Sequence, residues 1–135
     1  MKTLIIFFSR SGHNKQFAEE LAMEISADIE EIIDQKPKGF IMSGWQSKKK
    51  SKTEIAPIGK DPKTYDNVIF ITPLWFGGVP PAPRTYVEQH LEKIKSFAMV
   101  SVSGNGKDNE RYIDELENDY SLNISPRLMI SDKEF

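Results

Sequence analysis

Runs of consecutive apolar residues alternate along the chain with segments in which apolar residues return every three or four positions. The unbroken runs lie at residues 4–8, 68–71, 97–102 and, more weakly, 128–130, and a mixed apolar and acidic run lies at residues 29–33. Unbroken runs are typical of strands that are buried on both faces of a parallel sheet, whereas the mixed run suits an edge strand.

Three segments between these runs have a helical period. Their apolar stripes are Phe17, Ala18, Leu21, Ala22 and Ile25; Tyr86, Val87, Leu91 and Ile94; and Tyr112, Ile113, Leu116 and Tyr120. We expect Ser11 or Asn14 to cap the first helix and Asp108 or Asn109 to begin the third. Because strand and helix alternate, the pattern predicts parallel β-α-β units with right-handed crossovers. Within the less regular residues 36–66, residues 39–50 are compatible with a helix and the rest with a loop.

Length and composition indicate one domain, residues 1–135, that is long enough to bury a core. The formal net charge of -2 provides no basic field for nucleic acid. We interpret the one basic cluster, at residues 48–52, as a solvated loop or helix end. With no cysteine and with His13 and His90 as the only histidines, we expect neither a thiolate nor a zinc site.

The N-terminal apolar run stops at Ser9, which makes it too short for a secretory signal, and no stretch is long and apolar enough to span a bilayer. We therefore expect a cytoplasmic protein with neither a membrane nor a nucleic-acid partner.

Three unusual loops follow predicted strands, and the carboxyl ends of parallel strands share one edge of a sheet, where ligands bind. In the first loop, residues 9–14 combine hydroxyl groups, a glycine and backbone N–H groups at a helix N-terminus. This combination suits a phosphate group, although a polar turn that caps the helix explains it equally well.

The second loop, residues 72–83, places Trp75 and Phe76 before two glycines and a run of prolines. A flat apolar ligand would stack on these rings, or the rings could seal the end of the sheet. The third loop, residues 103–107, contains Gly-Asn-Gly, which permits either close approach of the backbone to a ligand or an ordinary turn.

Together the loops resemble those of the flavodoxin family. Residues 9–14 are similar to its phosphate loop, Thr/Ser-x-Thr/Ser-Gly-x-Thr, and residues 65–83 are similar to the region of its second flavin-contacting loop. Residues 103–106 take the place of the third loop. The resemblance implies an α/β fold with a doubly wound, five-stranded parallel sheet in the order 2-1-3-4-5, for which flavodoxin is itself the usual example, and FMN bound between strands one and three.

The resemblance also implies which residues bind the cofactor. The phosphate would be held by Ser9, Ser11, Gly12, His13 and Asn14. The isoalloxazine ring would be lined by Pro73, Trp75, Phe76 and Gly77, and its pyrimidine side by Ser103, Gly104, Asn105 and Gly106. No catalytic residue or metal ligand is expected. The implied function is that of a low-potential FMN electron carrier with redox partner proteins. The alternatives are an FMN-dependent NAD(P)H or quinone reductase and a cofactor-free interaction module.

Three features depart from the family pattern. Asn14 replaces a hydroxyl residue of the phosphate loop, and the near-neutral charge differs from the acidic surface typical of electron-carrying flavodoxins. Only residues 131–135 follow the last predicted strand, too few for the helix that normally closes the fold. We therefore expect an apolar sheet face to be left open and to mediate a homodimer.

Related folds fit the sequence less well. A phospho-accepting receiver domain needs carboxylates where Ser9 and Pro73 stand, and a small tyrosine phosphatase needs a cysteine nucleophile. A dinucleotide-binding domain needs G-x-G-x-x-G after the first strand, where this chain has a single glycine. No Ser-His-Asp set is indicated, because His90 lies in a helical stripe and is expected at the surface or half-buried.

Overall fold

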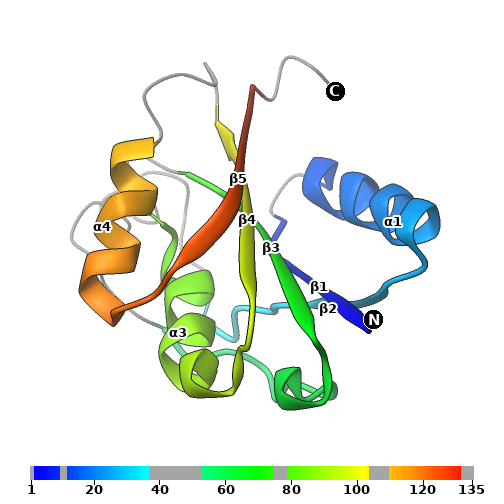
Figure 1. Ribbon diagram of the computed structural model, residues 1–135, viewed down its shortest axis with the longest axis horizontal. Coiled ribbons are helices and arrows are strands. Elements are labelled where there is room, and N and C mark those ends of the chain that lie inside the picture. Colours follow the sequence, from blue (N-terminus) through cyan, green and yellow to red (C-terminus); the bar gives the residue numbers. More distant parts are fainter. Residues whose placement is uncertain (1, 10–11, 37–52, 75–78, 104–109, 132–135) are drawn as a thin grey trace.

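The computed structural model of the protein describes residues 2–9, 12–36, 53–74, 79–103 and 110–131. Five parallel strands form one sheet in the order β2-β1-β3-β4-β5, with helices on both faces (Figure 1). The strands are β1 (Thr3–Phe7), β2 (Asp28–Glu31), β3 (Asn67–Pro73), β4 (Phe97–Ser103) and β5 (Ile124–Ser131). The helices are α1 (His13–Ile25), α3 (Pro81–His90) and α4 (Glu110–Tyr120), with short 3-10 helices η1 (Pro62–Thr64) and η2 (Leu91–Lys93). The predicted doubly wound, flavodoxin-like fold is confirmed.

The central strands are apolar on both sides because helices cover both faces of the sheet. In β1, Leu4 and Ile6 point into the layer beneath α3 and α4, whereas Ile5 and Phe7 point into the layer beneath α1. The short acidic strand β2 lies at one edge of the sheet, where its side chains are partly exposed, as its mixed pattern predicts.

The core therefore has two layers of different size (Figure 1). The larger layer lies between the sheet and helices α3 and α4, and it contains stacked rings from Phe70 and Tyr86 with centroids 5.9 Å apart. The smaller layer lies under α1, which contributes Ala18 and Ala22. Small side chains on this helix let its backbone approach the sheet closely.

The start of α1 differs from the prediction. Its N-cap is Gly12, with a left-handed backbone and no side-chain cap hydrogen bond. The prediction that Asn14 caps the helix was wrong, because Asn14 lies within the first turn and its Nδ2 donates to the Phe8 carbonyl oxygen at 3.1 Å. The alternative cap Ser11, the helix compatible with residues 39–50, and a helix start at Asp108 or Asn109 concern residues outside those described.

The strand β5 is longer than its apolar pattern indicates, because it includes Ser125, Pro126 and Arg127 before the apolar stretch that begins at Leu128. The side chain of His90 is half-buried at the end of α3, as expected. None of the helices in the described part of the chain has the length and apolar character needed to cross a bilayer.

Candidate functional site

The carboxyl ends of β1, β3 and β4 lie at one edge of the sheet. Phe7 pairs with Ile71 in the β1–β3 register, and Pro73 pairs with Val102 in the β3–β4 register. The Phe8 N–H donates to the Ile71 carbonyl oxygen at 3.0 Å, which brings the residue that follows, Ser9, to the level of Pro73. The chain runs from β1 outward to β2 and then returns to β3 on the other side of β1, so the strand order reverses there, and open α/β sheets bind their ligands at such a reversal.

The loop between β1 and α1 is shaped by a side chain and a glycine. The Gly12 N–H donates to Ser9 Oγ at 3.0 Å. Gly12 has a φ of 93°, which side-chain-bearing residues rarely adopt, and, apart from its two chain neighbours, a Cβ atom at this position would meet no heavy atom of the described residues within 4 Å. The backbone of Gly12 therefore borders open space at the start of the helix.

This open space lies beside backbone N–H groups that have no acceptor within the helix. The first helical hydrogen bond runs from the Gln16 N–H to the Gly12 carbonyl oxygen, at 3.1 Å. The N–H groups of residues 13–15 therefore lack an intrahelical acceptor, and they carry the positive end of the helix dipole. The first turn of α1 contains no acidic residue. Donors without an intrahelical acceptor, open space among the described residues and the absence of a carboxylate from this turn together fit an anion such as a phosphate group.

Asn14 has a structural contact at this site. Its buried side chain ties the first turn of α1 to the end of β1 through the Phe8 carbonyl oxygen. The predicted contribution of Asn14 to phosphate binding then rests on its backbone N–H. A residue that departs from the family pattern thus holds the loop in shape.

The loop after β3 is anchored at both of its described ends. Leu74 and Val79 are buried, and the Leu74 N–H donates to the Val102 carbonyl oxygen at 2.9 Å. The Thr72 hydroxyl, which we did not single out from the sequence, donates to the Pro73 carbonyl oxygen at 3.0 Å and fixes the end of the strand. The apolar run at residues 68–71 in β3 gave no indication of this polar contact at the end of the strand.

Six of the predicted site residues lie within the described part of the chain, and the structure brings them to this one edge: Ser9, Gly12, His13, Asn14, Pro73 and Ser103. The others lie outside the described residues, and their contacts stay predictions: Ser11, Trp75, Phe76, Gly77, Gly104, Asn105 and Gly106.

Two shifted pKa values belong to residues that are placed at the opposite edge of the sheet. A hydrogen bond from its hydroxyl to Asp28 Oδ2, 2.7 Å long, together with burial, raises the pKa of Tyr65 to about 12. Burial lowers the pKa of His90, which stacks on Tyr86 with ring centroids 4.6 Å apart. Neither residue lies at the carboxyl edge, where the described groups that could contact a ligand are backbone N–H groups and the Ser9 hydroxyl.

A family model described as flavodoxin matches residues 2–131. The chain belongs to the flavodoxin family. Among solved structures, this flavodoxin-family chain is similar to a flavoprotein in complex with FMN from Lactobacillus acidophilus NCFM, with a TM-score of 0.81 and 21% identity over 98% of this chain and 94% of that chain. The apo-form of the flavoprotein from the same organism gives a TM-score of 0.72 and 22% identity over 97% and 91% of the two chains.

A protein named as an NADPH-quinone reductase from P. pentosaceus is also similar, with a TM-score of 0.60 and 14% identity over 97% of this chain and 85% of that chain. No curated protein gave a significant match. At these identities the solved structures establish the flavodoxin-like fold, whereas the family is established by the match over nearly the whole chain.

Proposed function

We propose that this flavodoxin-family protein binds FMN non-covalently at the carboxyl edge of its sheet and serves as an electron carrier. The observation that carries the proposal is the geometry at Gly12, where open space borders the free N–H groups at the start of α1. Family membership and the similarity to a flavoprotein in complex with FMN support the choice of ligand.

The described residues would bind the phosphate group through hydrogen bonds. Ser9 Oγ accepts from the Gly12 N–H, which leaves the hydroxyl hydrogen of Ser9 available to a phosphate oxygen. The N–H groups of residues 13–15 add donors along the helix dipole. The flavin supplies reversible electron transfer when bound, and the protein supplies binding, orientation and exclusion of water.

The test is to titrate the apo-protein with FMN and with riboflavin, which lacks the phosphate. Two charge-assisted hydrogen bonds contribute about 3 kcal/mol or more, so we expect FMN to bind at least about 100-fold more tightly than riboflavin. Equal affinity for the two flavins, or no binding of either, would refute the phosphate site.

Gly12→Ala sharpens this test, because an alanine at a φ of 93° is strained although its Cβ has room. We expect the FMN-to-riboflavin ratio to fall by about fivefold or more, the equivalent of about 1 kcal/mol of backbone strain. Gly59→Ala is the matched control, since its Cβ would make an ordinary contact of 3.4 Å with Glu30 Oε1, and its ratio should not change.

The carrier function is separated from the reductase by a turnover assay. We expect the FMN-loaded protein to catalyse no oxidation of NADPH by a quinone and, once photoreduced without air, to reduce cytochrome c rapidly. Catalytic NADPH oxidation would favour the reductase, whose fold this chain shares at a TM-score of 0.60. A folded protein that binds no flavin would favour the interaction module.

We also propose that the protein forms a homodimer through the sheet face that carries α1. Of the described helices, α1 alone lies on this face, and its contacts are with β1, β2 and β3 (Figure 1). On the edge strand β5, the side chain of Leu128 is 51% exposed. A second copy that covers Leu128 would remove this apolar surface from water.

A further inference from the structure

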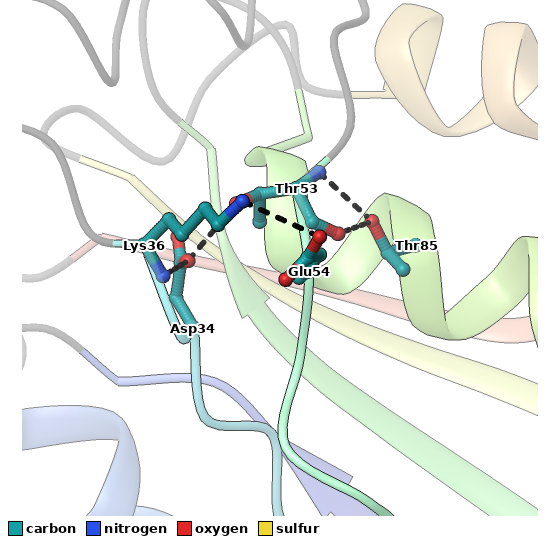
Figure 2. A network of polar contacts seen from close by, with 5 residues as sticks. All are labelled: Asp34, Lys36, Thr53, Glu54 and Thr85. Carbon is teal, nitrogen blue, oxygen red and sulfur yellow. Dashed lines mark hydrogen bonds and ion pairs between the residues drawn. The ribbon is translucent and has the colours of Figure 1, made fainter.

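A polar network joins three segments that are far apart in the sequence: residues 34–36, residues 53–54 and the start of α3 (Figure 2). At the α3 end of this network is the buried side chain of Thr85, and Thr53 links it to Asp34. Thr85 Oγ1 accepts a hydrogen bond from the Thr53 N–H at 3.1 Å. The same oxygen lies 2.7 Å from the Thr53 carbonyl oxygen and 3.0 Å from that of Pro81, so its hydrogen is donated to one of these two.

The other side of the network holds residues 53–54 against the segment that follows β2. Thr53 Oγ1 donates to Asp34 Oδ1 at 3.1 Å, and the same carboxylate oxygen accepts the Lys36 N–H at 2.8 Å. The Gln35 N–H donates to the Glu54 carbonyl oxygen at 2.9 Å. These contacts join residues 34–36 to residues 53–54, and Thr85 then joins residues 53–54 to α3.

The network belongs to the same edge of the sheet as the candidate site. The last residue of β2, Glu31, pairs with Phe7 of β1, so Asp34 lies beyond the carboxyl end of β2, beside the strand that leads to Ser9. On the other side, Pro81 begins α3 directly after the buried residues Val79 and Pro80, which lie within the second predicted loop, residues 72–83. Thr85 therefore connects the start of α3 to a segment on the opposite side of the candidate site.

The sequence at the start of α3 increases the importance of the contact between Thr85 and Thr53. Pro81 and Pro83 have no N–H group, so the first turn has fewer backbone donors than an ordinary helix start. The Thr85 hydroxyl, in contrast, reaches both the Pro81 carbonyl oxygen of that turn and the backbone of Thr53. Its position determines where the turn lies relative to residues 53–54.

We propose that Thr85 is a positioning residue of the flavin site, which holds the start of α3, and with it the end of the ring-side loop, against Thr53. The inference rests on the proposed function. It assigns Thr85 to the ring side of the site, whereas Ser9 and Gly12 belong to the phosphate side. The two sides can therefore be tested separately by comparing FMN with riboflavin.

Thr85→Val keeps the shape of the side chain and removes the hydroxyl, and with it both the hydrogen bond from the Thr53 N–H and the one donated to the Thr53 or Pro81 carbonyl oxygen. We expect FMN and riboflavin both to bind about tenfold more weakly, because part of the free energy of these two hydrogen bonds is then missing from the ordering of the site. The ratio of the two affinities should stay unchanged, because the phosphate loop is not touched. Thr85→Ser, which retains the hydroxyl, should restore both affinities.

Thr64→Val is the matched control. Thr64 Oγ1 donates to the Asp61 carbonyl oxygen at 2.8 Å in η1, which precedes β3 and lies at the opposite edge of the sheet. This variant loses a comparable hydroxyl-to-carbonyl bond and should leave both flavin affinities unchanged. Hydrogen exchange of the Thr53 amide in the apo-protein provides a readout without flavin, and Thr85→Val should accelerate it whereas Thr85→Ser should not.

The possible outcomes separate this inference from the proposed function. Weaker binding of both flavins at an unchanged ratio, with rescue by Thr85→Ser, supports the positioning role. Wild-type affinities in Thr85→Val overturn it and leave the proposed function intact, and a changed ratio overturns the assignment to the ring side. If the wild-type protein binds neither flavin, both proposals fail together. Thr85→Ala is measured in the same way, so that poor folding of the valine variant does not prevent a decision.

Discussion

The side chain of Arg127 on β5 holds helix α4 against the edge of the sheet, and its replacement should reduce the stability of the fold measurably. Its guanidinium lies 2.6 Å from Asp114 Oδ1, 2.6 Å from Glu117 Oε1 and 3.6 Å from Glu110 Oε1. Its Nε donates to the Ile124 carbonyl oxygen at 3.1 Å. Arg127→Met would retain most of the apolar stem and remove every one of these contacts.

The expected loss of stability depends on how far each carboxylate that contacts Arg127 is exposed to water. Glu110 and Asp114 are 68% and 56% exposed, so the loss of either ion pair costs at most about 1 kcal/mol because water screens it. Glu117 is only 22% exposed and the Arg127 side chain only 17%. Removing the guanidinium leaves a partly buried carboxylate without its counter-charge and removes one donor from the Ile124 carbonyl, which costs about 1–3 kcal/mol.

We therefore expect Arg127→Met to lower the free energy of unfolding by about 2 kcal/mol, equivalent to a fall in Tm of roughly 6–10 °C for a domain of this size. The assay is urea and thermal unfolding of the apo-protein at pH 7. Lys36→Met is the control, since its ion pair with Glu54 is exposed by 61% and 66% and should contribute about 0.5 kcal/mol or less. Equal losses in the two variants would refute the reasoning from burial.

Three further predictions concern other described residues. The Ser101 hydroxyl is fully buried and has no hydrogen-bond partner among the described residues. Ser101→Ala should therefore raise the free energy of unfolding, measured in urea, by up to about 1 kcal/mol. A loss of stability would show that the hydroxyl makes a stabilising contact. Because burial lowers the folded-state pKa of His90 below its usual 6.5, the unfolded chain binds the proton more readily, and stability should fall as the pH drops through 6.5. His90→Gln should flatten this dependence in unfolding measured from pH 7.5 to 5.5, and an unchanged slope would exclude His90 as its source. Leu128→Glu should convert the proposed dimer to a monomer in sedimentation experiments, whereas a wild-type monomer would refute the proposed interface.

The parallel sheet could be predicted from the sequence because the strands at its centre are buried on both faces, whereas the strand order was implied by the resemblance to the flavodoxin family. A run such as Leu4–Ile5–Ile6 is compatible with few positions other than the middle of a covered parallel sheet. The true length of β5 was missed because this edge strand includes Arg127, whose charge is neutralised by carboxylates on α4. An apolar run in the sequence gives no indication of a partly buried ion pair that forms between two elements.

The candidate site, like the fold, could be predicted only in part from the sequence. A candidate phosphate loop could be proposed because a glycine between polar residues directly after a buried strand is a local signal, and the positive φ of Gly12 accounts for that glycine. The contacts that shape the loop could not be predicted, since Asn14 was expected to cap the helix or to bind the ligand, and its side chain donates to the Phe8 carbonyl. The link from Thr85 to Thr53 spans 32 residues, and no local pattern reports it.

The two halves of the proposed site are held in shape by contacts within the protein. On the phosphate side, Ser9 Oγ accepts from the Gly12 N–H and Asn14 Nδ2 donates to the Phe8 carbonyl, so hydrogen bonds within the protein hold the start of α1 against the end of β1. When the donors of a site are already ordered, less free energy is lost in ordering them on binding, and the affinity is higher for the same contacts. The phosphate side should therefore bind inorganic phosphate weakly but measurably without the ring. Because Thr85 acts on the other half, its loss should leave the affinity for phosphate alone unchanged while that for riboflavin falls. This difference between the affinity for phosphate and the affinity for riboflavin follows from the separate hydrogen bonds of the two halves. It would not arise if flavin binding ordered the edge of the sheet as a single unit.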